Sequence, residues 1–418
     1  MPQSIRQCLA ILNGHYRIDG ISNTNLAARV NAHPHAQMPP GSTLAVKRAT
    51  VATGVDGSIQ ASPMQALLNL AKATAIAPNA QIFDWYQHWA CLRYIGAFQP
   101  TGGSLALSQQ AARVRANQRR VLSEELGVGF GIQVALAWHN TIAGGPPPHV
   151  IDLDLTLGDP LHWFNRQNGP TIVTDGRQPD YLLTDRNTGS HTFRVLSLEC
   201  KGSAETSTTI GQLARGVTQL SSLSLNGTTP QGIVVATVSN GNAIRYRAVD
   251  PPSDDTHITI ENEDWEIART TPRSSFLRNE EAVAIGASTM ARGIRAGTGR
   301  LAIFSGNLAA ARELLPLDLL EVASAFPRNR VTLENEHGLF RGVAHSFPTT
   351  EGPSIQVFLG VDSRIDAAME SGSLDALLDA QDELKETHPT SGHSPPGVSE
   401  ADSSSAVGID GSIMQISI

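Results

Sequence analysis

The sequence predicts an α/β (α+β) protein with a central mixed sheet flanked by helices, and three segments carry this prediction. Residues 191–201 read HTFRVLSLECK, an alternating run of strong β-formers. Residues 232–238 read GIVVATV, an apolar run typical of a strand that is buried on both faces. Between them, apolar residues recur at helical intervals from 208 to 225. A strand, a helix and a second buried strand in this order indicate a layered sheet domain.

Further predicted elements precede these three segments. From Ser104 to about Trp138 the chain has good helix formers and no proline, which predicts a long helix. Three glycines in this segment favour close packing of that helix against a neighbour. Residues 150–157 read VIDLDLTL, with the period of two of a strand, and residues 181–184 form a short apolar run before a turn. The resulting order is helix, three strands, helix and strand.

Composition and turn residues divide the chain into four regions. Residues 1–103 are expected to form a mostly helical N-terminal domain of unknown role, and residues 104–250 form the sheet domain. Residues 251–385 are expected to be mainly helical, with strands near 331–333 and 355–359. Residues 386–418 are rich in Ser, Pro and acidic residues, which predicts a disordered acidic tail. The short apolar end of this tail leaves open a terminal strand that docks onto a sheet or onto a partner.

The composition excludes several classes of protein. The chain has 418 residues and a net charge of −8, and it contains no apolar run of about 18 residues, so a membrane-spanning helix and a membrane partner are not expected. Its three cysteines lie far apart, which favours neither a disulfide framework nor a zinc cluster. The start of the chain has no secretory signal pattern. We therefore expect a cytoplasmic protein.

The charge is unevenly distributed along the chain. Residues 1–120 carry 11 Lys and Arg against 3 Asp and Glu, whereas residues 361–418 carry 2 basic against 11 acidic residues. A basic first part can approach phosphate groups, and an acidic tail cannot. Two solvated surfaces explain the same distribution without any ligand.

Two acidic residues and a lysine stand where the predicted strands bring them together. Asp180 precedes one predicted strand, and Glu199 and Lys201 lie near the end of the next. Side chains alternate between the two faces of a strand, so Glu199 and Lys201 share a polar face while Cys200 points into the core. Because the two strands are expected to be neighbours, Asp180 can come close to Glu199.

This arrangement suits the hydrolysis of a phosphodiester bond. Two neighbouring carboxylates repel unless a hard cation lies between them, and oxygen ligands suit Mg²⁺ or Mn²⁺. A lysine beside the metal can orient or deprotonate water and can offset charge on a phosphate. The alternative is a surface strand on which Glu199 and Lys201 form a solvated ion pair and Asp180 caps a turn. Asp152 and Asp154 could supply a further carboxylate, which an exposed strand face explains equally well.

At these residues the sequence resembles the PD-(D/E)xK nuclease superfamily, over roughly residues 104–240. The family has a restriction-endonuclease-like core of a helix, three strands, a helix and a further strand, which is the order predicted above. The resemblance implies that Asp180 and Glu199 are metal ligands and that Lys201 is the catalytic lysine. It also implies Mg²⁺ as the cofactor, with Mn²⁺ able to substitute.

Two further residue types follow from the same resemblance. Many members carry a metal-binding Glu on the helix before the sheet, and Glu124 is the closer match to the usual Glu-x-x-Gly pattern. Some members use a Gln on the following helix to position DNA or metal, a part that Gln212 or Gln219 could take. The Gln-x-x-x-Tyr form of one branch is absent because Gly216 stands at the fourth position.

The resemblance implies a metal-dependent nuclease that cuts DNA, with restriction or antiviral defence as the setting. The sequence places a basic stretch on the helix that leads into the site, formed by Arg113, Arg115, Arg119 and Arg120, which we expect to contact phosphates. Because the whole chain is acidic, we expect an oligomer or a partner protein to assist DNA binding. The alternatives are a catalytically degenerate subunit that acts in binding or assembly, and a nuclease directed at RNA.

Overall fold

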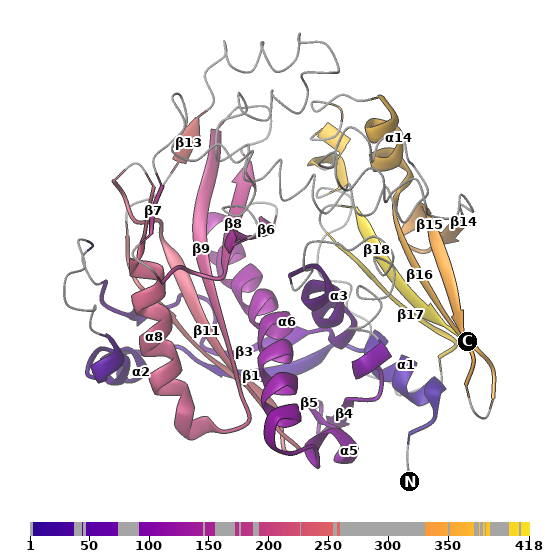
Figure 1. The fold of residues 1–418 in the computed structure, drawn as a ribbon, viewed down its shortest axis with the longest axis horizontal. Coiled ribbons are helices and arrows are strands. Elements are labelled where there is room, and N and C mark those ends of the chain that lie inside the picture. The colour runs from indigo at the N-terminus through magenta and orange to yellow at the C-terminus, as the bar shows by residue number, and fades with distance from the viewer. Residues whose placement is uncertain are drawn as a thin grey trace.

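A computed structural model gives the fold. It describes residues 3–36, 44, 47–73, 92–144, 147–154, 172–174, 177–186, 192–225, 227–253, 257–259, 331–349, 352–371, 376, 379–380, 382–384, 401–408 and 411–418. Among these residues the protein is a mixed α/β structure with two large sheets, a central one and a C-terminal one (Figure 1).

The central sheet has eleven strands among the described residues. Its main order is β4 (Phe98–Thr101), β5 (Ser104–Leu107), β1 (Tyr16–Ile21), β12 (Ile244–Asp250), β11 (Gly232–Ser239), β9 (Thr192–Ser203), β8 (Tyr181–Arg186) and β6 (His149–Asp152). Three short strands pair beside this path: β2 (Thr50–Val51), β3 (Gly57–Ala61) and β13 (His257–Thr259). A separate short pair joins β7 (Ile172–Thr174) to β10 (Leu223–Leu225).

Strands β6, β8, β9 and β11 form the part of the sheet around the candidate site. The β6–β8 and β8–β9 pairs are antiparallel, whereas β9 and β11 are parallel. Helix α6 (Ala116–Ala143) precedes β6, and helix α8 (Thr209–Ser221) connects β9 to β11. A parallel pair needs a crossover connection, and α8 provides it. The mixed central sheet flanked by helices agrees with the predicted fold class.

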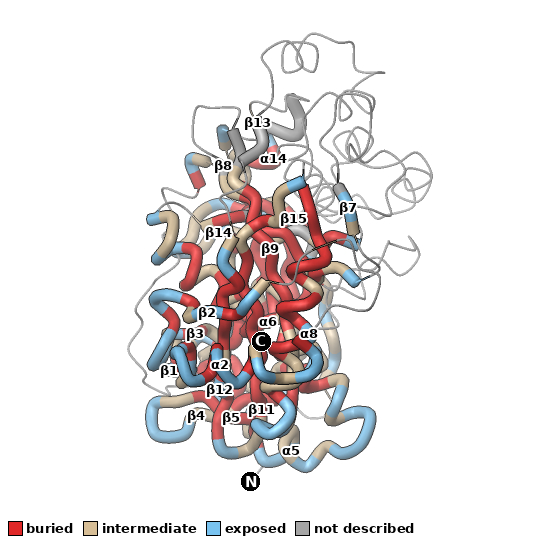
Figure 2. The backbone as a smooth tube through the Cα atoms, turned by 90° about the vertical axis from the view of Figure 1, so that its left-hand side faces the viewer, coloured by how far each residue is buried: buried red, intermediate tan, exposed pale blue. Residues whose placement is uncertain are grey.

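Helix α6 packs closely on one face of β9, as its glycines predict. A Cβ atom on Gly127 would stand 2.5 Å from the Gly202 Cα, and one on Gly131 would stand 2.8 Å from the Cys200 Sγ. Gly129 faces Ala66 of helix α3 (Pro63–Ala73) in the same way. These three positions therefore allow α6 to lie between the sheet and α3. Figure 2 shows the middle of β9 as buried.

The N-terminal region is not the separate helical domain expected for residues 1–103. Its helices α1 (Ile5–Asn13), α2 (Thr24–Asn31) and α3 are accompanied by strands β1 to β4, and all four strands belong to the central sheet. Strand β1 pairs in parallel with β12, more than 200 residues later in the chain. The expected long helix from Ser104 is also corrected, since residues 104–107 form β5 and α6 begins only at Ala116 after the short helix α5 (Gln109–Ala112).

The C-terminal sheet has the order β14 (Val331–Asn335), β15 (Gly338–Phe347), β16 (Ile355–Asp362), β18 (Ser412–Ser417) and β17 (Ser403–Val407). The expected strands near 331–333 and 355–359 both form, and each pairs with β15 rather than with the other. Helix α14 (Ser363–Ser371) follows β16. Residues 260–330, to which most of the expected helical content belonged, lie outside the described residues.

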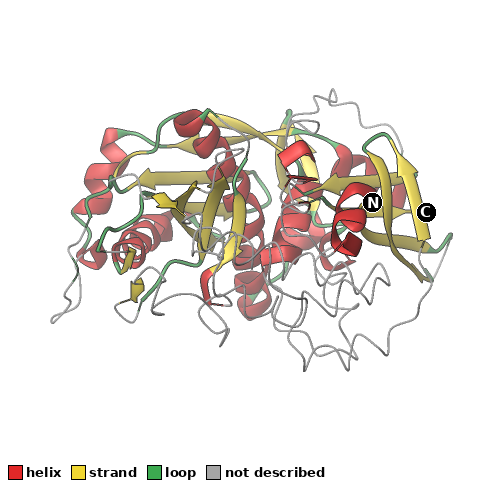
Figure 3. Cartoon of the chain, turned by 90° about the horizontal axis from the view of Figure 1, so that it is seen from above, coloured by secondary structure: helices red, strands yellow, loops and turns green. Residues whose placement is uncertain are grey.

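The end of the chain corrects the expectation of a disordered tail for the part that the structure describes. Strand β18 pairs with β16 and with β17, so the last residues are an inner strand of a sheet. Strand β17 contacts α1 and α3, and the Arg6 guanidinium lies 3.1 Å from the Asp402 carboxylate. Figures 1 and 3 show the C-terminus on this sheet. The alternative of a terminal strand that docks onto a sheet agrees with this arrangement.

Candidate active site

The β8–β9 register brings Asp180 next to Glu199. Tyr181 pairs with Leu198, so the preceding residue, Asp180, falls opposite Glu199. The Asp180 N–H donates to the Glu199 Oε2 at 2.9 Å, and the Cys200 N–H donates to the Asp180 Oδ2 at 3.2 Å. Each carboxylate is therefore held by a backbone N–H of the other strand. The sequence prediction that these two residues meet agrees with the structure.

Glu199 is fully buried, which the sequence did not predict. Helix α8 covers its face of the sheet, and a Cβ atom on Gly216 would stand only 3.1 Å from the Glu199 Cγ. Glu199 and Ser197, on the same face, are both 0% exposed. The face expected to be polar and open is thus a buried layer between β9 and α8. Cys200 is buried on the opposite face, against α6, as predicted.

Lys201 stands at the open end of this buried layer. Its ammonium forms an ion pair with the Glu199 Oε1, and its side chain keeps 24% of its surface exposed. Charges this deeply buried persist only when they are paired, because desolvation of an isolated ion costs several kcal/mol. The ion pair between Glu199 and Lys201 is therefore largely buried, whereas the alternative interpretation expected a solvated ion pair on a surface strand.

The three groups shift each other's proton affinities. Burial raises the pKa of Glu199 well above its usual range, and the Asp180 charge raises it further, against the opposing effect of Lys201. Burial also raises the pKa of Asp180, which Lys201 and the Cys200 N–H partly oppose. Burial lowers the pKa of Lys201, but Glu199 and Asp180 outweigh it and the net pKa rises. Shifts of this kind cluster at functional sites.

Asp180 and Glu199 are the two carboxylates that could hold a divalent metal ion. Mg²⁺ binds proteins through one or two carboxylates and completes its coordination with waters and substrate phosphates. Asp180 and Glu199 would supply the two carboxylates. In the structure the Lys201 ammonium is the cation paired with Glu199. No group of three His, Cys, Asp or Glu side chains that could hold a metal is found within the described residues.

Glu124 lies on α6, on the other face of the sheet from Glu199. The Glu124 Cα lies beside Gly202, where an added Cβ would stand 2.7 Å from it. The Glu124 side chain is 58% exposed and forms an ion pair with Arg120 at 3.9 Å. The structure therefore does not bring the Glu124 carboxylate into a group with the two other predicted ligands.

The two glutamines of α8 both contact backbone beside the site. The Gln212 amide donates to the Gly202 carbonyl at 3.1 Å, and its Oε1 is buried without a hydrogen-bond partner. The Gln219 amide donates to the Gln178 carbonyl, also at 3.1 Å, two residues before Asp180. They fix α8 to β9 and to the segment that leads into β8.

Three of the four arginines predicted to contact phosphates are exposed, and the fourth, Arg119, is used within the fold. Arg119 is partly buried and donates to the Ser239 carbonyl at the end of β11, where it holds α6 to the sheet. Arg120 pairs with Glu124. Arg113 and Arg115 are exposed at the junction of α5 and α6, which leaves them accessible to a ligand.

Sequence reasoning left the role of Asp154 open and did not single out Gln178. The Gln178 amide donates to the Asp154 carboxylate, and the Asp154 charge contributes to the raised pKa of Asp180. Asp152 lies opposite Tyr181 in the β6–β8 register, so of the two acids Asp154 acts on the site residue Asp180. The position of Gln178 just before Pro179-Asp180 is the only signal in the sequence that could have indicated it.

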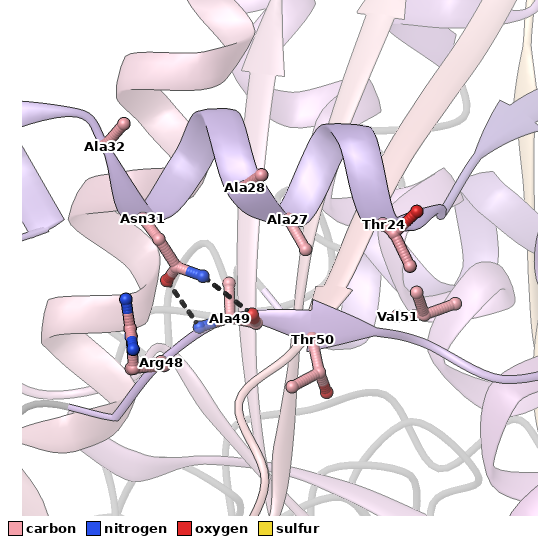
Figure 4. A pocket seen from close by; sticks show the side chains of 9 residues that line it. All are labelled: Thr24, Ala27, Ala28, Asn31, Ala32, Arg48, Ala49, Thr50 and Val51. Carbon is pink, nitrogen blue, oxygen red and sulfur yellow. Dashed lines mark hydrogen bonds between the residues drawn. The ribbon is translucent and has the colours of Figure 1, made fainter.

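A pocket of about 490 Å³ lies elsewhere on the molecule, between α2 and the residues leading into β2 (Figure 4). Alanine and threonine side chains form most of its lining, together with Arg48. The Asn31 side chain closes one wall by pairing with the Ala49 backbone at 2.9 and 2.8 Å. None of the predicted site residues lines this pocket.

Comparison with models of protein families, with curated proteins and with solved structures finds no match to this chain. Among the helices that the structure describes, none combines the length and the apolar character needed to span a membrane. The fold and the site define a mixed α/β protein that carries two adjoining carboxylates and a lysine on neighbouring strands.

Proposed function

We propose that this chain is a metal-dependent nuclease that hydrolyses DNA phosphodiester bonds, with Mg²⁺ or Mn²⁺ as its cofactor. The observation that carries the proposal is the contact between Asp180 and Glu199, with Lys201 paired to Glu199. The order α6, β6, β8, β9, α8 and β11 also agrees with the core that the resemblance to the PD-(D/E)xK superfamily implies.

In this function Asp180 and Glu199 would hold the metal ion, which would supply Lewis acidity toward water and the phosphate. Lys201 keeps its proton at neutral pH, because the neighbouring carboxylates raise its pKa. We therefore assign it as a cation that offsets charge on the phosphate, rather than as the base that deprotonates water. Burial beneath α8 excludes water from one side of the site and strengthens these interactions.

The main alternative is a degenerate nuclease fold that serves in binding or assembly. One observation favours it: the Glu199 oxygens are engaged by the Asp180 N–H and by Lys201, and Glu124 points away. An RNA-directed nuclease would use the same site chemistry, so the distinction rests on substrate.

The test is cleavage of plasmid DNA, linear DNA and RNA by the full chain, with Mg²⁺, with Mn²⁺ and with EDTA. The variants Asp180→Asn, Glu199→Gln and Lys201→Met each remove one charge at nearly constant volume. Glu336→Gln is the matched control, because Glu336 is 84% exposed.

We expect metal-dependent cutting by the wild type and by the control, and a loss of about 10³-fold in each site variant. Cutting that survives all three substitutions would overturn the assignment of the site. Cutting of RNA alone would support the alternative substrate, and absence of cutting with every substrate would favour the degenerate fold.

A further inference from the structure

A group of four basic side chains lies on the outer side of helix α8. It contains His33, His35, Arg177 and Arg215, and we call it the α8 basic cluster. The His33 and His35 rings lie 4.9 Å apart, and the Arg215 guanidinium lies 3.4 Å from the His35 Nε2. Arg177 is close enough for its charge to act on His35. Three segments far apart in the sequence thus converge on one surface.

The protein holds the two histidines in place on α8. The Thr218 hydroxyl donates to the His35 carbonyl at 2.8 Å, and the His35 N–H donates to the His33 Nδ1 at 3.2 Å. A Cβ atom on Gly211 would approach the His33 ring to 3.3 Å, so the glycine leaves room for the imidazole. Figure 1 shows α2, which leads into this turn, beside α8.

The cluster has positive charge without a matching acid. Within the part of the chain that the structure describes, neither Arg177 nor Arg215 forms an ion pair with a carboxylate. Partial desolvation and the charges of Arg215, His33 and Arg177 lower the pKa of His35, as expected where cations crowd together. Such a surface attracts an anion, because an anion offsets the repulsion between the neighbouring cations.

The cluster adjoins the candidate active site through α8 and the segment before β8. Arg215 is next to Gly216, which lies over Glu199. Arg177 is three residues before Asp180, and three residues span at most about 11 Å. One strand of a duplex carries a phosphate about every 3.4 Å along the axis, so this reach corresponds to about three nucleotides.

We propose that the α8 basic cluster binds the phosphate backbone of duplex DNA and holds it beside the Asp180–Glu199 pair, within about three nucleotides of the bond to be cut. The proposal rests on the proposed function and names its substrate contact. The contact is independent of base sequence, because charges that meet phosphates carry no base information.

Binding to a fluorescent 20-base-pair duplex, measured in EDTA over a range of salt concentrations, tests the contact without any cutting. The full-length Arg177→Ala/Arg215→Ala variant removes two exposed charges from the cluster. Arg6→Ala/Arg17→Ala removes the same charge from α1 and β1, where both arginines are exposed and paired with acids. Arg177→Lys/Arg215→Lys keeps the charge and serves as the conservative variant.

We expect the cluster variant to bind about tenfold more weakly near 100 mM salt and to lower the slope of log affinity against log salt by about 2. The control should change affinity less than about twofold, and the lysine variant should keep the wild-type slope. Equal affinities for the cluster and control variants would overturn the proposal, as would a wild type that does not bind the duplex.

A parallel cleavage assay with Mg²⁺ separates this proposal from the proposed function. If binding depends on the cluster and no DNA is cut, the contact stands and the nuclease assignment fails. If DNA is cut and the cluster variant binds and cuts like the control, the contact fails and the nuclease assignment stands. Cluster-dependent binding that is tighter to duplex RNA supports the contact and moves the substrate to RNA.

Discussion

The two faces of strand β9 are both buried, but they bury different chemistry. On the α6 face, Leu196, Leu198 and Cys200 pack against a helix whose glycines allow a close approach. On the α8 face, Ser197 and Glu199 are equally inaccessible, and Lys201 closes the end of the layer. Apolar burial stabilises the fold, whereas a buried ion pair is often no better than an apolar replacement. The α6 face therefore accounts for stability, and the buried charges of the α8 face are the ones to which we assign the proposed function.

Breaking the buried ion pair between Glu199 and Lys201 should have the largest effect on stability. Lys201→Met leaves Glu199 as an uncompensated buried charge, which we expect to lower the free energy of unfolding by about 3 kcal/mol. The double variant Glu199→Gln/Lys201→Met removes both charges and should recover most of this loss. Urea denaturation of the three proteins measures the effect. A single variant that is as stable as the wild type would show that the pair is not buried in solution.

The same pair predicts how stability depends on pH. The folded-state pKa values of Glu199, Asp180 and Lys201 are all raised, so the folded state binds more protons than the unfolded state. The stability contributed by the carboxyl groups is therefore fully present below their ordinary pKa of about 4. It is lost as the pH rises through their raised values.

Denaturation of Glu199→Gln between pH 5 and pH 8 checks this sign. The variant lacks the titrating group, so we expect its stability to fall less over this range than that of the wild type. A steeper fall in the variant would contradict the raised pKa of Glu199.

On the α6 face, a single methyl group should be enough to disturb the packing. Gly127→Ala places a Cβ 2.5 Å from backbone of Gly202, where no side chain can move aside. Alanine normally favours a helix over glycine by about 1 kcal/mol, but overpacking costs about 1–3 kcal/mol, and we expect a net loss of about 2 kcal/mol. Asn117→Ala, at an exposed position of the same helix, should be neutral or stabilising. A stabilised Gly127→Ala variant would contradict the close contact of α6 with β9.

The exposed ion pair of α6 should have the smallest effect. Arg120 and Glu124 are 69% and 58% exposed and 3.9 Å apart, and pairs of this kind contribute about 0.5 kcal/mol or less. Arg120→Ala should therefore leave the unfolding midpoint nearly unchanged. A loss comparable with that of Lys201→Met would mean that exposure does not explain the difference between the two pairs.

The sequence predicted the central strands and the meeting of Asp180 with Glu199 because both depend on local patterns. The alternation around Glu199 assigns the two faces of β9, and adjacent antiparallel strands are close in the chain. It did not predict that α8 covers the polar face, since the periodicity of a helix does not say which side of a sheet it occupies. Gly216 is the local sign of that close packing.

The missed strands depend on partners that their own residue patterns do not reveal. Strand β1 owes its place to β12, more than 200 residues away, and its sequence YRIDGI alternates apolar and polar residues over four positions only. Strand β17 reads SSSAV, a composition typical of a loop, and it forms a strand by pairing with β18. The α8 basic cluster was missed for the same reason, since its members come from three separate segments.

The most direct test of the account is a calorimetric titration of Mn²⁺ into the full-length protein and its Asp180→Asn and Glu199→Gln variants. The account predicts that the wild type binds one ion per chain at this site, and that either substitution removes that binding because only two carboxylates supply it. Identical titration curves for the three proteins would contradict it, and would leave the buried charges on the α8 face without the metal-binding role assigned to them.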